Sequence, residues 1–250
     1  MDYKTGNPAL GEKTFGRLAG PVAAAERMTL QGTVNKSFML LVLLLATALW
    51  TWARFFSSGG DSAAVAGPMW IGVIGGFVLA LIISFKQTFA PYLALPYAAL
   101  EGLAIGGISA LFEKRYPGIA IQAVALTFGV LAVLLLAYTS RLIRVTERFK
   151  SIVVAATGAI ALVYLLSFAL GFFHINMPFL NDASPMGLLV SLAIIVVAAL
   201  NLVLDFNFIE SGVAQGAPRY MEWYSAFGLI VTLVWLYLEI LRYLSKVKQR

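Results

Sequence analysis

Acidic side chains inside long apolar runs are the residues of this sequence best suited to chemistry. Four of them fall within such runs or close to their ends: Glu101, Asp205, Glu222 and Glu239. A carboxylate is expensive to hold in hydrocarbon, and those found there mostly bind protons or ions, or pair with other polar groups. The expected chemistry is therefore proton or cation binding.

Glu101 lies midway through the run LPYAALEGLAIGGIS, and Tyr97, four residues earlier, shares its helical face. Gly102 and Gly106 follow, and small residues allow helices to approach closely. Two interpretations are open. Glu101 is either a proton- or cation-binding carboxylate that faces a cavity, or a protonated acid that ties helices together by hydrogen bonds.

Asp205 lies near the end of another run, in AALNLVLDFNFIE, with Asn201 one turn before it on the same face. A carboxylate with an amide four residues earlier can bind a cation or hold a hydrogen-bonded proton network. The alternative is an interfacial acid that only reaches into water at the end of its helix.

The last run, MEWYSAFGLIVTLVWLYLEILRYL, carries a narrow polar stripe. At about 100° per residue, Glu222, Ser225, Thr232 and Glu239 fall within one sector about 100° wide. The other faces are almost wholly apolar. This pattern predicts a helix inside a bundle, with its stripe facing a cavity.

Consecutive antiparallel helices would place Asp205 and Glu222 at similar depth. Two neighbouring carboxylates share protons, and they can bind a divalent cation when both are ionised. We therefore expect Asp205 and Glu222 to sense protons and to form a site for a divalent cation. Alternatively, Glu222 is only a helix N-terminal acid favoured by the macrodipole, and Glu239 only pairs with Arg242 three residues later.

Seven apolar runs position these residues. A helix needs about 20 apolar residues to cross the hydrocarbon layer. The hydrophobic fraction is 60%, the charged fraction is 12% and the mean hydropathy is +0.87, which is typical of an integral membrane protein. The runs lack the alternation of a barrel, so the prediction is an all-α, seven-transmembrane-helix bundle. The expected spans are 38–56, 65–85, 90–112, 118–140, 151–173, 186–208 and 222–244.

The chain divides into an N-terminal segment, 1–35, and a transmembrane domain, 36–250. Phe15, Leu18 and Val22 have helical spacing, so the first segment is either a short interfacial helix or a partly disordered tail. Lysine and arginine predominate on the side of the N-terminus, which predicts that it is cytoplasmic. The basic C-terminal tail favours the opposite orientation.

The absence of some residue types excludes several functions. The chain has no cysteine and one histidine, His174, so a zinc site and a histidine-dependent hydrolase are not expected. We expect no enzymatic activity and no resident cofactor. The basic isoelectric point, 9.6, reflects cations at loop ends, which suit anionic lipid. The expected partner is the bilayer, with no nucleic acid.

Three segments resemble the Bax inhibitor-1 family, and in particular its bacterial YccA-like group. They are NPAL at 7–10 with KTF at 13–15, YAALEG, GGIS and FEKRYPGIAIQA within 97–123, and PRYMEWYSAFGLIVTLVWLYLEILR at 218–242. The resemblance covers nearly the whole chain. It implies six helices around a central seventh, a bacterial inner-membrane location and a pH-dependent Ca²⁺ leak.

The resemblance also implies a pair of proton-sensing aspartates, one in the sixth span and one in the seventh. Asp205 matches the first, whereas the second has no clean counterpart, and alignment of the helix ends puts Leu229 near its position. The leading hypothesis is a Ca²⁺ leak gated by carboxylate protonation, with Glu101 and Glu239 as further cavity acids. The alternative is a non-conducting regulator that binds a membrane protease or another stress-response partner.

Overall fold

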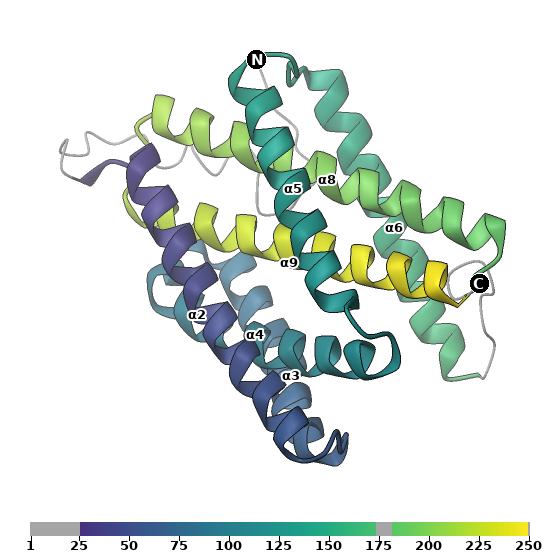
Figure 1. The fold of residues 1–250 in the computed structure, drawn as a ribbon. Coiled ribbons are helices and arrows are strands. Elements are labelled where there is room, and N and C mark those ends of the chain that lie inside the picture. The colour runs from purple at the N-terminus through teal and green to yellow at the C-terminus, as the bar shows by residue number, and fades with distance from the viewer. Residues whose placement is uncertain (1–25, 174–181, 250) are drawn as a thin grey trace. The chain divides into compact units, whose positions relative to one another are not determined.

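The computed structural model describes residues 26–173 and 182–249. These residues form seven long helices and a short 3₁₀ turn, with one isolated bridge between Arg27 and Pro218 and no strand (Figure 1). The elements are α2 (Leu30–Ser57), α3 (Ala63–Phe85), η2 (Gln87–Phe89), α4 (Ala90–Arg115), α5 (Ile119–Thr139), α6 (Glu147–Gly171), α8 (Pro185–Ala214) and α9 (Tyr220–Lys248). His174 and the expected helix around residues 15–22 lie outside the described residues.

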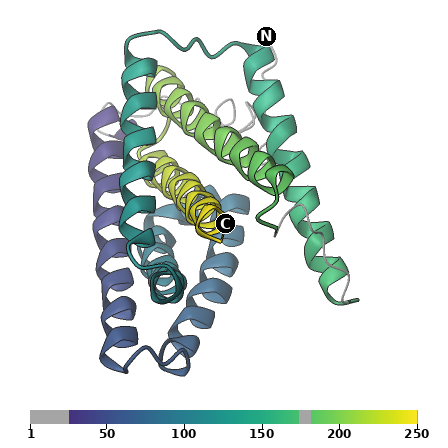
Figure 2. The same ribbon diagram turned by 45° about the vertical axis from the view of Figure 1, so that its right-hand side comes forward.

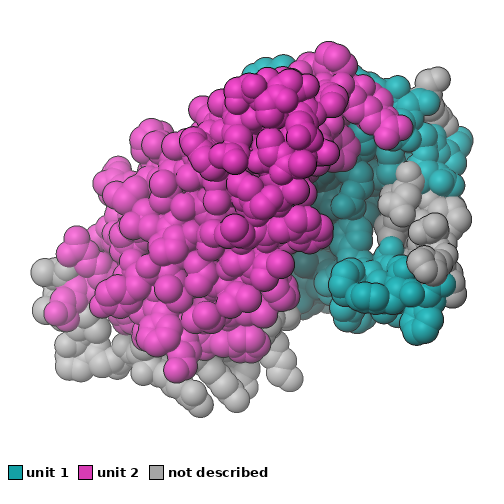
Figure 3. All heavy atoms as spheres, turned by 90° about the horizontal axis from the view of Figure 1, so that it is seen from below, with its two compact units in different colours: residues 1–12, 121–206, 232–250 teal, residues 13–120, 207–231 magenta. Residues whose placement is uncertain are grey.

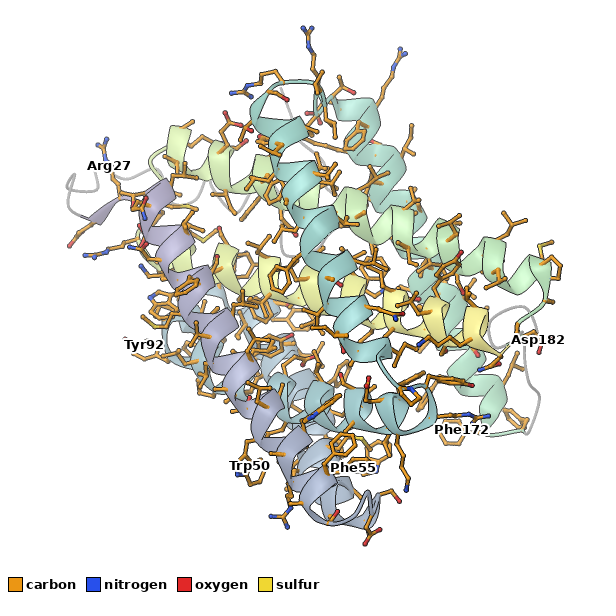
Figure 4. All side chains as sticks on the ribbon, in the orientation of Figure 1. Arg27, Trp50, Phe55, Tyr92, Phe172 and Asp182 are labelled. Atoms are coloured by element: carbon orange, nitrogen blue, oxygen red, sulfur yellow. The ribbon has the colours of Figure 1, made fainter. Side chains whose placement is uncertain are left out.

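All seven long helices are long and apolar enough to cross a membrane, which confirms the predicted fold class. Large apolar side chains remain exposed along them, and Figure 4 shows Trp50 and Tyr92 on the outer surface. Apolar side chains on this surface cost nothing when the surrounding solvent is lipid. The chain is therefore an integral membrane protein.

The first span begins earlier than the hydropathy pattern predicted. Helix α2 begins at Leu30, not at 38, because Thr29 caps it: the Thr29 hydroxyl accepts a hydrogen bond from Gly32 N at 2.9 Å. The polar stretch 31–37 is thus helical, and Lys36 lies on α2 and not in a flexible segment. Hydropathy detects the apolar part of a helix, whereas capping determines where the helix starts.

The chain forms two compact units, coloured separately in Figure 3. Among the described residues, unit 1 comprises 121–206 and 232–249, and unit 2 comprises 26–120 and 207–231. Helices α8 and α9 each contribute one part to each unit. The acids predicted from sequence are therefore divided, with Asp205 and Glu239 in unit 1 and Glu101 and Glu222 in unit 2.

In unit 2, α2 and α3 pack against α4 (Figures 1 and 2). The approach of α4 to α2 depends on glycine. A Cβ atom at Gly102 would collide with the hydroxyl of Thr47 and the carbonyl of Leu44, and one at Gly106 would collide with the carbonyl of Ala48. Small residues are thus required along this face of α4, as its glycine content predicted.

In unit 1, α8 is held by side chains from α5 and α6. Asn201 Nδ2 donates to Thr157 Oγ1 of α6 at 2.8 Å. The ring of Phe206 packs against Tyr138 of α5, with the centroids 5.7 Å apart. Helix α9 is the most buried span: in its apolar stretch 67% of the residues are buried inside the protein, against 6% in α6. This agrees with the central helix that the resemblance implies.

Candidate functional site

Glu222 lies in the first turn of α9 and its carboxylate is fully engaged. Oε1 accepts hydrogen bonds from the backbone N–H and the hydroxyl of Thr29, both at 2.8 Å, and Oε2 pairs with Lys36 Nζ. The side chain is only 2% exposed. Three donors from α2 and its cap therefore satisfy a buried charge, which is the condition for holding one in a protein interior.

The surroundings of Glu222 show why these elements meet. A Cβ atom at Gly32 would collide with the carboxylate, so only glycine leaves room for it against α2. The residues before α2 also pair with the α8–α9 connection, through Met28 N to Ala217 O at 2.6 Å and Arg219 N to Glu26 O at 2.7 Å. The carboxylate lies at the positive end of α2, where negative charge is stabilising. Glu222 thus caps a second helix and ties two segments of unit 2 together.

Asp205 on α8 has a different environment. Its carboxyl group shares a hydrogen bond with the hydroxyl of Thr232 on α9. Its other oxygen, Oδ2, is buried and has no hydrogen-bond partner among the described residues. The seventh-span residue that hydrogen-bonds to Asp205 is therefore Thr232, which lies in the same unit.

Asn201 was expected to share a polar network with Asp205. Its amide nitrogen donates to Thr157 Oγ1 and to the Val197 carbonyl, both at 2.8 Å, and its support of Asp205 stays a prediction. The amide donor is thus used to join α8 to α6. Helical spacing placed Asn201 and Asp205 on neighbouring positions, but the rotation of α8 against α6 decided which neighbour the amide reached.

The predicted pairing of Asp205 with Glu222 stays a prediction. Each carboxylate has its own partners, Thr232 for Asp205 and Thr29 with Lys36 for Glu222. No group of three or more acidic, histidine or cysteine residues in the described part of the chain could hold a metal ion.

Glu101 on α4 lies at the contact with α3. It hydrogen-bonds to Tyr97 on its own helix, as their spacing predicted, and its Oε2 lies 3.0 Å from the position of a Cβ atom at Gly76. The Tyr97 ring packs edge-on against Phe227, with the centroids 4.8 Å apart. This environment is compatible with either of the roles expected for Glu101.

Glu239 is buried near the C-terminal part of α9. Its Oε1 accepts a hydrogen bond from the Tyr164 hydroxyl at 2.7 Å and lies 3.5 Å from Arg242 Nη1, which confirms the expected pair three residues apart. Its Oε2 is buried without a hydrogen-bond partner among the described residues. Ser225 Oγ, on the same predicted stripe, is likewise buried without a partner there.

Four participants were not singled out from the sequence: Thr29, Lys36, Thr157 and Tyr164. Thr29 precedes a helix and could have been found as an N-cap. Lys36 is the last charge before a long apolar run, but it was read as a cytoplasmic topology signal. Tyr164 had no detectable signal, because a tyrosine in an apolar run is ordinary core composition.

The profile of a protein family described as Bax inhibitor 1 like matches residues 7–249. The match covers nearly the whole chain, including all seven spans and every acid discussed above. The chain therefore belongs to the Bax inhibitor 1 like family. No curated protein and no solved structure matches it.

Proposed function

We propose that this membrane protein binds and passes cations, with Ca²⁺ as the leading candidate, under the control of carboxylate protonation. The observation that supports this best is Asp205 Oδ2, a buried carboxylate oxygen on α8 with no partner among the described residues. A buried polar group without a partner costs about 1–3 kcal/mol. A proton or a cation bound at this oxygen would offset that cost.

Protonation and cation binding compete for the same oxygen. When Asp205 is ionised, Oδ2 offers a hard anionic ligand of the kind that Ca²⁺ prefers. When a proton occupies Oδ2, the negative charge and that ligand are lost. The Thr232 hydroxyl, which hydrogen-bonds to the carboxyl group, would hold it in place in both states. Passage of cations past Asp205 should therefore depend on pH.

The remaining acids have supporting roles in this proposal. Glu101 and Glu239 would be further acids along the path of the ion. Glu222 could join Asp205 as a sensor or Ca²⁺ ligand only after releasing Lys36. The same proposal places the protein in the bacterial YccA-like group. It also places the protein in the inner membrane, with its N-terminus in the cytoplasm.

The test is Ca²⁺ flux into proteoliposomes at pH 6, 7 and 8 for the native protein and for Asp205→Asn. We expect a pH-dependent flux in the native protein and a flux with little pH dependence in the variant, because Asn cannot titrate. Glu147→Gln is the matched control: Glu147 is an exposed acid at the start of α6 that pairs with Lys150. It should leave the pH profile unchanged.

Folded native protein that gives no flux above empty liposomes at any of these pH values would contradict the conducting function. The second function, a non-conducting regulator of a membrane protease or another stress-response partner, would then take its place. A pH profile unaltered by Asp205→Asn, in the presence of flux, would instead remove Asp205 as the sensor.

A further inference from the structure

A cluster in unit 1 combines a buried carboxylate with a tyrosine from a second helix. Glu239 of α9 is 2% exposed, and the Tyr164 hydroxyl of α6 donates to its Oε1 at 2.7 Å. Glu239 Oε2 has no hydrogen-bond partner among the described residues. The cluster thus holds three oxygens, of which one is unused.

Arg242 supplies the positive charge beside these oxygens. Its Nη1 donates to the Tyr164 hydroxyl at 2.6 Å but lies 3.5 Å from Glu239 Oε1, beyond ordinary hydrogen-bond length for a charged pair. The guanidinium also lies over the Tyr164 ring, 5.2 Å from its centroid. The Arg242 side chain is 41% exposed, against 3% for Glu239. The cation therefore sits at the accessible edge of a buried anion and contacts it loosely.

Among the described residues, Lys246 and Asp182 are further charged groups near this cluster. Lys246 Nζ is buried and donates to Ser191 Oγ at 2.8 Å and to the Gly187 carbonyl at 3.2 Å, so α8 holds it. Asp182 precedes α8 and interacts with Lys246 electrostatically. Neither group satisfies Glu239 Oε2. This buried oxygen thus keeps an unused lone pair among the described residues.

We propose that Glu239 and Tyr164 form a second cation-binding point, at which Arg242 is a tethered competitor of the free ion. The proposal rests on the proposed function, since its ligand is the same Ca²⁺. Displacement of the exposed guanidinium would leave two carboxylate oxygens and one hydroxyl for the ion. Three protein oxygens are fewer than the six to eight that Ca²⁺ takes, so the ion keeps much of its water and binds weakly. Weak binding is what conduction requires, because the ion must also leave.

A purely structural role for the cluster makes a different prediction. If Arg242 only ties α9 to α6 through Tyr164, its removal costs some stability and does nothing for ion binding. If Arg242 competes with a free ion, its removal strengthens ion binding, and only while Glu239 keeps its charge. Binding of Ca²⁺ to the arginine variant therefore separates the two roles.

The experiment is equilibrium binding of radioactive ⁴⁵Ca²⁺ to the full chain in detergent. Arg242→Gln should tighten Ca²⁺ binding about three- to tenfold, since a partly exposed ion pair contributes only modestly. Glu239→Gln should abolish binding at this point, and the double variant should show no gain. Arg148→Gln is the matched control, because it removes one exposed positive charge from α6 and should leave the affinity unchanged. Arg242→Lys retains the competing charge but loses the guanidinium that lies over Tyr164, so it should tighten binding by less than Arg242→Gln does.

An Arg242→Gln protein with native thermal stability but unchanged Ca²⁺ affinity would overturn the inference. So would an equal gain in the double variant, because the gain would then not depend on Glu239. The flux assay on native protein is independent of both results. Native flux without tighter binding leaves the proposed function standing and removes this site, whereas tighter binding without native flux supports the site and removes conduction.

Discussion

Glu222 and Glu239 lie on the same helix, α9, yet the two units of the protein treat them differently. Both are 2% exposed. Glu222, in unit 2, accepts from three donors supplied by Thr29 and Lys36, whereas Glu239, in unit 1, retains an oxygen without a partner among the described residues. A carboxylate whose two oxygens both have hydrogen-bond donors holds helices together. A carboxylate with one unpaired oxygen can still accept a proton or bind an ion.

The same contrast extends to Asp205, a second acid of unit 1 with a buried carboxylate oxygen. Asp205 resembles Glu239, since one of its oxygens is hydrogen-bonded and the other has no partner among the described residues. Polar networks in which every group is hydrogen-bonded make a structure rigid. A buried group left without a partner costs free energy unless a proton, an ion or water binds to it. This difference gives the Glu222 network a structural role and is the reason why the proposed ligand binding was placed at Asp205 and Glu239.

The largest effect should come from Glu222→Gln. The substitution leaves Lys36 partly buried without its counter-ion, and breaking such a pair typically costs about 3–5 kcal/mol. Glu239→Gln should cost less than about 1.5 kcal/mol, because the Tyr164 hydrogen bond can persist and Arg242 is partly exposed. The measurement is the midpoint of thermal unfolding in detergent, followed by circular dichroism.

A second variant tests the cause of that effect. Lys36→Met combined with Glu222→Gln removes the stranded charge and should recover part of the lost stability. Glu222→Gln and Glu239→Gln should not lose equal free energies of unfolding. Equal losses would contradict the comparison, because the carboxylate with a full set of donors should contribute more to stability.

An intermediate effect is expected from glycine replacement, which tests whether packing also differs between the units. Gly102→Ala in unit 2 should destabilise the protein by about 1–3 kcal/mol, since the new methyl group would collide with the backbone carbonyl of Leu44. Gly129→Ala in unit 1 is the control, because nothing lies within 4 Å of its added Cβ atom. It should be neutral or stabilising by up to about 1 kcal/mol. Unfolding midpoints of both variants, compared with the native protein, decide this.

The smallest effect should come from Ser225→Ala. Ser225 belongs to unit 2, but its buried hydroxyl has no partner among the described residues. Its removal breaks no hydrogen bond, and the cost of the small cavity that it leaves opposes the gain from removing an unpaired polar group, so stability should change by less than about 0.5 kcal/mol. A loss of stability above about 1 kcal/mol would show that the hydroxyl stabilises the fold. The polar residues of α9 would then differ less in their contributions to stability than the contrast between Glu222 and Glu239 indicates.

Parts of the candidate site could be predicted from the sequence. The polar stripe of α9, the pairing of Glu239 with Arg242 and the contact of Glu101 with Tyr97 follow from helical spacing within one element, and the structure contains each of them. The partners of Asp205, Glu222 and Asn201 were not predictable, because each belongs to a different helix. Helical spacing fixes neighbours along one helix but leaves its rotation against the next one open.

The sequence by itself determined the solvent and the secondary structure. Apolar runs of membrane-spanning length must form helices, because lipid offers the backbone no hydrogen bonds, and the acids within them are rare enough to be found at once. Only the tertiary structure decided which acid has donors for both of its oxygens. For Glu222, that outcome depends on where α2 starts and on the room that Gly32 leaves beside Thr29. For Asp205 and Glu239, it depends on the contacts that α9 makes with α8 and with Tyr164 of α6. Hydrogen bonds between helices require positions within about 3 Å, and no pattern along a single chain specifies them.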